Sequence, residues 1–354
     1  MNKLLLIPFL VVIGSFTAKS QSDSILSPYD VSDTLSKDFG LFTNDEILNI
    51  SLRFDVSEYR RKKPKEEYMD ALLTYHISDK DSVNKQVRLK TRGEFRNSYC
   101  SFPPIRLNFK KTEFQKDDLK DLGKVKMVTH CNSGNDSYVF KEYLIYKLYN
   151  VITDYSFRVR LMKVEYINTG KKSKSIYSYA FLIEPVEYLA KRLNIIPVES
   201  LNLGQSNVKP EFMDRMAVFC YMIGNTDWSV PNQHNCKLFS QPLSENPSLG
   251  LIIPYDFDYS GLVNASYAVP PENLGIKSVL DRKYLGYCRT QEEFSIAVKE
   301  FSDKKAEIYK TINEFSYLSE RQKKEMINYL DGFYEQFDKQ NNIVLSILKD
   351  CKEK

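Results

Sequence analysis

Two short segments in the second half of the chain carry side chains whose types and spacing suit phosphoryl transfer. The first is Gly224-Asn225-Thr226-Asp227, which continues through Asn232, His234 and Asn235, and the second is Tyr255-Asp256-Phe257-Asp258. Such transfer needs a carboxylate that orients or deprotonates the acceptor, an asparagine shortly after it, and a second carboxylate that follows an apolar strand. Both segments supply these groups in that order.

Within this set, Asp227 is the candidate catalytic residue and Asp256 is the candidate metal ligand. Oxygen ligands favour Mg²⁺ or Mn²⁺, so a divalent ion bound together with ATP is the expected cofactor. Asn232 and Asn235 are both candidates for a further ligand, as is Asp258. The alternative is that these residues form turns and loop caps, as Asn and Asp often do.

The phosphates also need a cation, and the first half of the chain offers several. Lys126 lies in a short apolar segment ahead of Glu142 on a predicted helix, an order like that of the lysine–glutamate pair of kinase folds. Lys124 on the same segment is the alternative. The sequence contains no GxGxxG motif, and Arg92-Gly93 is the candidate for a turn beside the phosphates because glycine allows close approach of the backbone.

The order of these motifs resembles that of the CotH-type spore-coat kinase family, over residues 68–265. The matching elements are Arg92-Gly93 after a strand, Lys126 and Glu142, Asn225-x-Asp227, and Asp256-x-Asp258. Members of that family are secreted, atypical protein kinases with a reduced kinase fold. The resemblance implies an α+β, reduced protein-kinase-like fold with a strand-rich N-terminal lobe and a helix-rich C-terminal lobe. It also implies Asp227 as the catalytic aspartate and Asp256 as the metal-binding one.

One residue of the family pattern is missing. CotH-type proteins usually carry a lysine after the Arg-Gly turn, where this chain reads Ser-Phe-Pro-Pro at 101–104. Arg106 or Lys126 would have to take its place. The residues expected at the nucleotide are therefore Lys126, Glu142, Arg92 and Arg106.

The resemblance implies that ATP is a partner and that the acceptor is a protein or a cell-envelope component. Two alternatives stay open. One is a pseudokinase that keeps the fold as an envelope binding module. The other is a glycosyltransferase in which Asp256-Phe257-Asp258 is the metal-binding DxD of a nucleotide-sugar site. The second is less favoured, because the chain lacks the alternating strand–helix pattern of a parallel sheet.

Alternating apolar and polar residues predict a strand-rich region before residue 185. The predicted strands are Ile47–Phe54, Tyr68–Ile77, Gln86–Thr91, Ile105–Phe109, Val125–Val128, Arg158–Ile167 and Ile176–Ile183. A helix is expected between the fifth and sixth of these strands, from Asp136 or Ser137 to Asn150. The basic run Arg60 to Lys65 is expected to be a solvated loop.

The region after residue 185 is predicted to be mainly helical. The expected elements are a helix from Pro210 that Gly224 ends, strands at Cys236–Phe239 and Leu251–Pro254, a capping box of Thr290 with Glu293, and a long helix from Ser319 through Leu348. The two strands lead directly into, or out of, the two motifs. The motifs are therefore expected on loops at the ends of short elements.

The first twenty residues have the pattern of a secretory signal peptide. Lys3 supplies positive charge, residues 4–16 are apolar but too short to span a bilayer, and Ala18-Lys19-Ser20 forms a cleavage site. The expected organisation is a signal peptide at 1–20, an exposed lead-in at 21–45, an N-lobe at 46–185 and a C-lobe at 186–354. We therefore expect a secreted or periplasmic protein without a stable membrane span.

Charge and cysteine content support this assignment. The chain has 50 Lys and Arg against 46 Asp and Glu, and a balance this close to neutral argues against a nucleic-acid partner. Six cysteines in an exported chain predict disulfides. Cys100 and Cys131, which follow neighbouring predicted strands, are the expected pair. Cys220, on the apolar face of a predicted helix, is expected to be a buried thiol.

Overall fold

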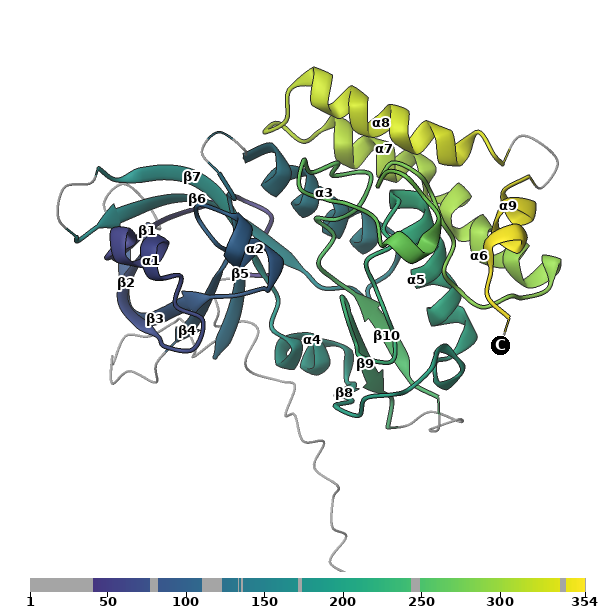
Figure 1. The fold of residues 1–354 in the computed structure, drawn as a ribbon, viewed down its shortest axis with the longest axis horizontal. Coiled ribbons are helices and arrows are strands. Elements are labelled where there is room, and N and C mark those ends of the chain that lie inside the picture. The colour runs from purple at the N-terminus through teal and green to yellow at the C-terminus, as the bar shows by residue number, and fades with distance from the viewer. Residues whose placement is uncertain are drawn as a thin grey trace, which may run out of the picture. The chain divides into compact units, whose positions relative to one another are not determined.

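The computed structural model describes residues 41–76, 82–109, 123–132, 134, 136–170, 174–242, 249–337 and 342–353. All of these belong to one compact unit. Strands dominate its first part and helices its second (Figure 1), so the α+β class expected from the sequence is observed. The predicted signal peptide and most of the predicted lead-in lie outside the described residues.

The strands of the first part close into a seven-stranded barrel in the order β1-β2-β3-β4-β5-β7-β6. They are β1 (Leu48–Phe54), β2 (Met69–His76), β3 (Ser82–Thr91), β4 (Ile105–Phe109), β5 (Lys124–Thr129), β6 (Val159–Asn168) and β7 (Ile176–Ile183). Neighbours are antiparallel except β1 and β6, whose parallel pairing closes the barrel. This closed barrel departs from the standard kinase lobe that the resemblance implied.

Residues at the start of the described chain cover part of the barrel core. Leu41 and Phe42 are only 1% and 5% exposed and belong to the same hydrophobic cluster as Leu52, Leu89 and Met127. The prediction of an exposed lead-in through residue 45 is therefore wrong at these two residues, whereas residues 43–45 are exposed. Two adjacent apolar side chains in a mainly polar stretch were too weak a signal to predict burial.

Helix α3 (Asp136–Ile152) follows β5 and packs against β7 and against α7 of the second part. It begins where the sequence predicted and ends two residues beyond Asn150. Eleven of its residues are buried, including the polar Lys141 and Glu142. A helix buried on so many sides brings its few charged groups into the interior, where they require partners.

The segment after the barrel supplies the scaffold of the two motifs. It contains α4 (Val186–Leu193), α5 (Pro210–Ile223) and a three-stranded sheet of β8 (Ile196–Pro197), β9 (Cys236–Ser240) and β10 (Leu251–Pro254), with a short 3₁₀ turn at Gln205–Asn207. Gly224 ends α5 in the left-handed conformation at φ 66°. A Cβ there would lie 2.0 Å from the Tyr329 hydroxyl, so this turn requires glycine both for φ and for space.

The C-terminal region contains a 3₁₀ turn at Glu272–Leu274 and the helices α6 (Gln291–Asp303), α7 (Lys305–Asn313), α8 (Glu320–Tyr334) and α9 (Asn342–Asp350). Thr290 and Ser319 cap α6 and α8 as predicted. The single long helix expected from Ser319 through Leu348 is wrong, because α8 ends at Tyr334 and α9 is a separate helix. No helix in the described part of the chain is long and apolar enough to cross a membrane.

Two short helices of the barrel region were not predicted. Helix α1 (Val56–Lys62) contains half of the basic run that was expected to be a loop, and α2 (Phe95–Tyr99) lies in the connection between β3 and β4. Helices of five to seven residues are too short for their apolar spacing to stand out in the sequence. The second of them carries residues that matter for the site.

The structure contains one disulfide bond in the barrel region and one in the C-terminal region. Cys100 and Cys131 form the expected bond, with their Cα atoms 4.7 Å apart, and Cys288 and Cys351 form a second that was not predicted. Cys220 is a buried free thiol as expected, and so is Cys236. Two disulfides are compatible with a protein exported to an oxidising compartment.

The buried imidazole of His130 gives a stability prediction. His130 is 4% exposed, stacks on Phe102, and its Nδ1 has no hydrogen-bond partner among the described residues. Burial lowers the pKa of His130 to about 4 from 6.5. Between these two pH values the unfolded chain binds a proton that the folded protein excludes. Stability is therefore full above pH 6.5, and we expect it to fall by about 3 kcal/mol as the pH drops to 4.

Urea unfolding between pH 4 and 7 measures this slope. His130→Asn should lower the pH dependence of the unfolding free energy, whatever its effect on the stability at pH 7. His76→Asn is the matched control, because His76 is exposed at the end of β2. An unchanged slope in His130→Asn would show that other groups cause the acid sensitivity.

Candidate active site

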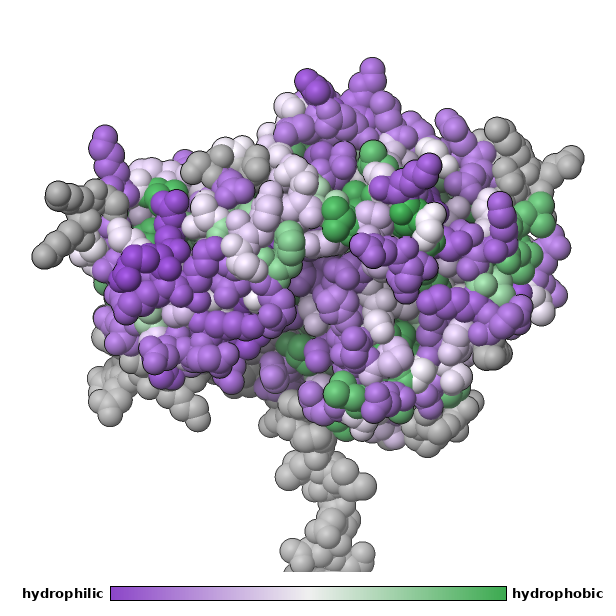
Figure 2. All heavy atoms as spheres, viewed as in Figure 1, coloured by the Kyte–Doolittle hydropathy of each residue, from purple (hydrophilic) through white to green (hydrophobic). Residues whose placement is uncertain are grey.

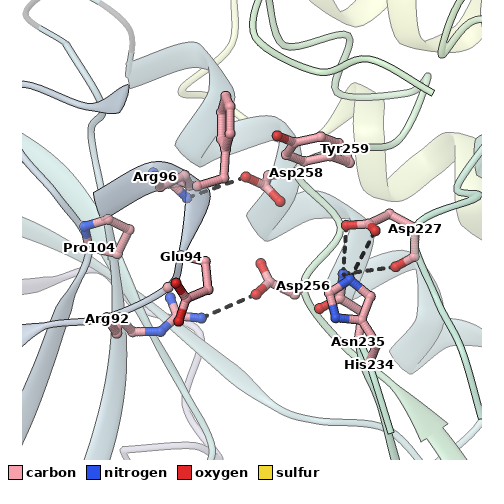
Figure 3. A pocket seen from close by; sticks show the side chains of 12 residues that line it. Arg92, Glu94, Arg96, Pro104, Asp227, His234, Asn235, Asp256, Asp258 and Tyr259 are labelled. Carbon is pink, nitrogen blue, oxygen red and sulfur yellow. Dashed lines mark hydrogen bonds and ion pairs between the residues drawn. The ribbon is translucent and has the colours of Figure 1, made fainter. Parts of the chain in front are cut away.

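A cavity of about 410 Å³ brings the two sequence motifs together. Its lining includes Asp227 and Asn235 from the loop after α5, and Asp256 and Asp258 from the loop after β10. The connection between β3 and β4 forms the opposite wall, with Arg92 and Arg96 (Figure 3). In the space-filling view, hydrophilic atoms dominate the hollow between the barrel and the helical part (Figure 2).

Both carboxylate oxygens of Asp227 are held by neighbours on its own loop. His234 Nε2 lies 2.9 Å from Oδ1, and Asn235 Nδ2 donates to Oδ2 at 2.9 Å and to the Asp227 carbonyl at 2.8 Å. The Asp227 backbone N–H donates to Asn225 Oδ1, which fixes the turn after Gly224. The hydrogen bond to Asp227 raises the pKa of His234 above its usual value. The carboxylate is thus oriented but keeps a side chain that is 29% exposed.

Asp256 occupies a constrained position immediately after β10. Its φ of 63° is in the left-handed region, which is uncommon for a residue other than glycine and is enriched at functional sites. Its backbone N–H donates to the buried Tyr146 hydroxyl at 2.8 Å, and its Oδ2 lies 3.3 Å from Arg92 Nη2. The backbone strain and the α3 tyrosine together direct this carboxylate into the cavity.

Asp258 is almost fully buried, at 5% exposure. The Tyr267 hydroxyl donates to its Oδ2 at 2.9 Å, and Arg96 Nη1 lies 3.8 Å from the same oxygen. Burial and the neighbouring charge of Asp256 raise the pKa of Asp258 to about 6. The cavity lining contains four acidic side chains, Glu94, Asp227, Asp256 and Asp258, against two arginines, Arg92 and Arg96.

Glu142 joins this acidic group from α3. It is 1% exposed, its Oε1 has no hydrogen-bond partner among the described residues, and its Oε2 lies 3.7 Å from Arg96 Nη1. Burial, followed by repulsion from Asp258 and Asp256, raises its pKa well above the usual value. The predicted pairing of Glu142 with Lys126 is wrong in this structure, because the cation beside Glu142 is Arg96.

Arg96 is the site residue that the sequence analysis missed. It lies on α2, is 9% exposed, and donates from Nη2 to the Thr129 carbonyl at 2.7 Å while its other nitrogen faces Glu142 and Asp258. Its only sequence signal is its place four residues after Arg92 in the Arg-Gly turn. Because α2 was not predicted, nothing in the pattern indicated that this side chain points inward.

Lys126 and Arg106 line a second, smaller cavity of about 160 Å³, together with Lys124 and Tyr255. The Lys126 ammonium lies 3.8 Å from the centroid of the Tyr255 ring. Burial and the positive charge of Arg92 lower the pKa of Lys126 to about 7. Of the predicted nucleotide-binding residues, Arg92 thus lines the first cavity, Arg106 and Lys126 line the second, and Glu142 lines neither.

The two asparagine candidates occupy different positions. Asn235 lines the first cavity and uses its amide nitrogen on Asp227, which leaves its Oδ1 available to a ligand. Asn232 is exposed, and its Oδ1 accepts from the His234 backbone N–H. The geometry therefore favours Asn235 for the role in metal binding that the sequence left open.

The donor set fits a hard divalent cation. Carboxylates of Asp256 and Asp258 and the amide oxygen of Asn235 are ligands of the kind that Mg²⁺ and Mn²⁺ prefer. The raised pKa of Asp258 and the unpartnered Glu142 oxygen indicate a need for further positive charge. No three His, Cys, Asp or Glu side chains of the described chain form a ready-made metal cluster. Phosphate oxygens of a substrate would therefore have to complete the coordination.

Comparisons with known proteins give similarity to solved structures alone. No protein-family model and no curated protein matches the sequence. Among solved structures, the Helicobacter pylori proinflammatory kinase CtkA is similar with a TM-score of 0.39 and 14% identity, covering 73% of this chain and 95% of that chain. We draw no functional conclusion from a similarity of this size.

Proposed function

We propose that this protein is an exported, CotH-like phosphotransferase that uses ATP and Mg²⁺ or Mn²⁺ to modify a hydroxyl group of a protein or a cell-envelope component. The observation that carries the proposal is the meeting of Asp227, Asn235, Asp256 and Asp258 in one cavity opposite Arg92. Three separate segments of the sequence, at residues 92, 227–235 and 256–258, supply a phosphate-binding cation, a base and metal ligands in one place. Phosphoryl transfer depends on this combination.

Each residue has a role that follows from its contacts. Asp227, oriented by His234 and Asn235, is placed to accept the proton of the acceptor hydroxyl. Asp256 and Asn235 would hold the divalent ion, which neutralises phosphate charge when bound. Arg92, now 3.3 Å from Asp256, is free to turn to a phosphate once the ion compensates that carboxylate.

A binding module without catalysis is the second candidate. Lys126 contacts Tyr255 and not Glu142, so the pair that positions phosphates in kinase folds is replaced by Arg96 with Glu142. A pseudokinase would keep the cavity and lose transfer. Nucleotide binding and transfer therefore have to be measured separately.

Metal-dependent ATP binding tests the proposal. We expect the purified mature protein to bind ATP with Mg²⁺ or Mn²⁺ present and much more weakly in EDTA. Asp256→Asn should weaken the metal-dependent affinity at least roughly tenfold, since even indirect partners of a metal are worth about 10–100-fold in affinity. Isothermal calorimetry measures both values.

Asp303→Asn is the matched control, because Asp303 is the last residue of α6 and forms an exposed ion pair with Lys299. It should bind ATP like the wild type. Equal affinity in all three proteins would contradict the metal role of Asp256. A wild-type protein that binds no nucleotide with either metal would overturn the kinase proposal and favour the binding module.

A further inference from the structure

The second cavity is lined by a row of cations on the outer face of the barrel. Arg106 of β4 lies directly opposite Lys126 of β5. Lys124 precedes Lys126 by two residues on the same strand and therefore lies on the same face. Their neighbours Leu107 and Val125 point into the barrel core. Like charges directly opposite each other destabilise a sheet, so this arrangement has a cost unless an anion binds.

In the described part of the chain, no carboxylate forms an ion pair with any of these three cations. Of the two acids that line the cavity, Glu184 is already paired with Arg192 at 2.9 Å, and Glu187 is exposed and forms no ion pair with the three cations. Lys126 is instead placed over the Tyr255 ring. Burial and the positive charge of Arg92 lower the pKa of Lys126, while the Asp256 carboxylate opposes this shift. The cavity is therefore suited to a strongly anionic group.

The first cavity contains an aromatic surface where the second contains a row of cations. Phe95 and Tyr259 line it, with ring centroids 5.6 Å apart, and Phe95 remains 41% exposed. Tyr99 stacks on Phe95 at 5.2 Å and extends the aromatic surface. Aromatic rings of this kind bind nucleobases by stacking, with little dependence on the base. Asp256 lines the cavity that contains this aromatic surface, and the preceding residue Tyr255 lines the cavity that contains the cation row.

We propose that a nucleoside triphosphate binds with its base against Phe95 and Tyr259 and its β- and γ-phosphates among Arg106, Lys124 and Lys126, so that the chain transfers a nucleotidyl group. In this direction the α-phosphate lies beside Asp256. The proposal rests on the proposed function for nucleotide and metal binding, and it replaces the γ-phosphorus of that proposal by the α-phosphorus as the reacting atom. The opposite direction of binding would place the γ-phosphate at Asp256 and give phosphoryl transfer.

The reaction balances with the groups at hand. The acceptor hydroxyl oxygen attacks the α-phosphorus, and its proton passes to Asp227. The bond between the α-phosphorus and the oxygen that bridges to the β-phosphorus breaks, and pyrophosphate leaves with that electron pair. The three cations hold the leaving pyrophosphate, whose charge grows as the bond breaks. The acceptor gains a nucleoside monophosphate.

The position of an isotope label in the products distinguishes the two directions of nucleotide binding. The mature protein, with itself and water as acceptors, is incubated with Mn²⁺ or Mg²⁺ and ATP labelled at the α- or at the γ-phosphate. We expect the α-label on protein or in AMP, and the γ-label in pyrophosphate. Formation of ADP with the γ-label on protein or in free phosphate would overturn the inference and leave the proposed kinase function standing.

If the protein cleaves neither the α–β nor the β–γ phosphate bond of ATP, a binding measurement tests the inference. The double variant Arg106→Gln/Lys124→Gln should bind ATP roughly 10–100-fold more weakly, since each charge-assisted hydrogen bond is worth about tenfold, while its affinity for AMP stays unchanged. Lys90→Gln is the matched control, because Lys90 lies opposite Arg106 on the same face but outside the cavity.

The single variant Arg106→Gln repeats the test if the double variant fails to fold. Unchanged ATP affinity in a folded variant would overturn the inference. A wild-type protein that binds no nucleotide with either metal would remove both the inference and the proposed function.

Discussion

Replacing Asp227 by asparagine should abolish most group transfer while leaving nucleotide affinity nearly intact. The carboxylate lies at the cavity but holds its hydrogen bonds with His234 and Asn235, and an amide of the same shape can keep the contact with His234. What the amide cannot do is accept the acceptor proton. General-base assistance is typically worth about 10²–10⁴ in rate, so we expect a loss of that size in kcat.

Single-turnover kinetics with saturating ATP and divalent metal measure this loss. ATP affinity and the thermal midpoint serve as controls, because a variant that misfolds would lose both. Transfer at the wild-type rate would contradict the role of Asp227, whichever phosphorus of the nucleotide reacts. Loss of ATP binding together with transfer would instead assign Asp227 to the nucleotide site.

Replacing Arg96 by methionine should destabilise the metal-free protein by about 3 kcal/mol, the lower end of the range for breaking a buried ion pair. Glu142 and Asp258 are nearly buried, and Arg96 is the cation within 4 Å of both. Its removal leaves two carboxylates facing each other at low dielectric. The contacts of 3.7 and 3.8 Å are long, and the raised pKa of Glu142 allows protonation to offset part of the cost.

Urea unfolding with and without Mg²⁺ separates the structural role of Arg96 from its role at the site. The divalent ion with ATP should restore part of the lost stability, because it supplies the missing positive charge. Arg96→Lys should fall between wild type and Arg96→Met. The control Arg321→Met removes an exposed pair with Glu325 and should change stability by less than about 1 kcal/mol. Equal effects of the two methionine variants would refute the assignment.

Several structural features could be predicted from local sequence patterns. Alternation located all seven barrel strands, and the polar start of α3 and the glycine that ends α5 fixed the limits of those helices. The predicted pairing of Cys100 with Cys131 is confirmed, and the structure gives its reason: Cys100 precedes β4 and Cys131 follows β5, and these two strands are antiparallel neighbours. The strands and the helix limits depend on residues close in sequence, so the sequence alone was enough to predict them.

Closure of the barrel was not readable. It depends on the parallel pairing of β1 with β6, whose register joins Leu48 to Met162 across more than a hundred residues. Alternation tells that each strand has an inner and an outer face, but not which strand lies beside it. The second disulfide, Cys288 with Cys351, was hidden for the same reason.

The candidate site, too, could be predicted from the sequence only in part. The sequence by itself determined that Asp227 and Asp256 stand on loops at the ends of short elements, with an asparagine and a second aspartate beside them. Only the tertiary structure decided which cation serves Glu142, because Arg96 reaches it from an unpredicted five-residue helix. Likewise, only strand register placed Arg106 opposite Lys126 and so created a second, cationic cavity. Residue type fixes what chemistry a side chain can do, whereas its partners are set by long-range packing, which no local pattern encodes.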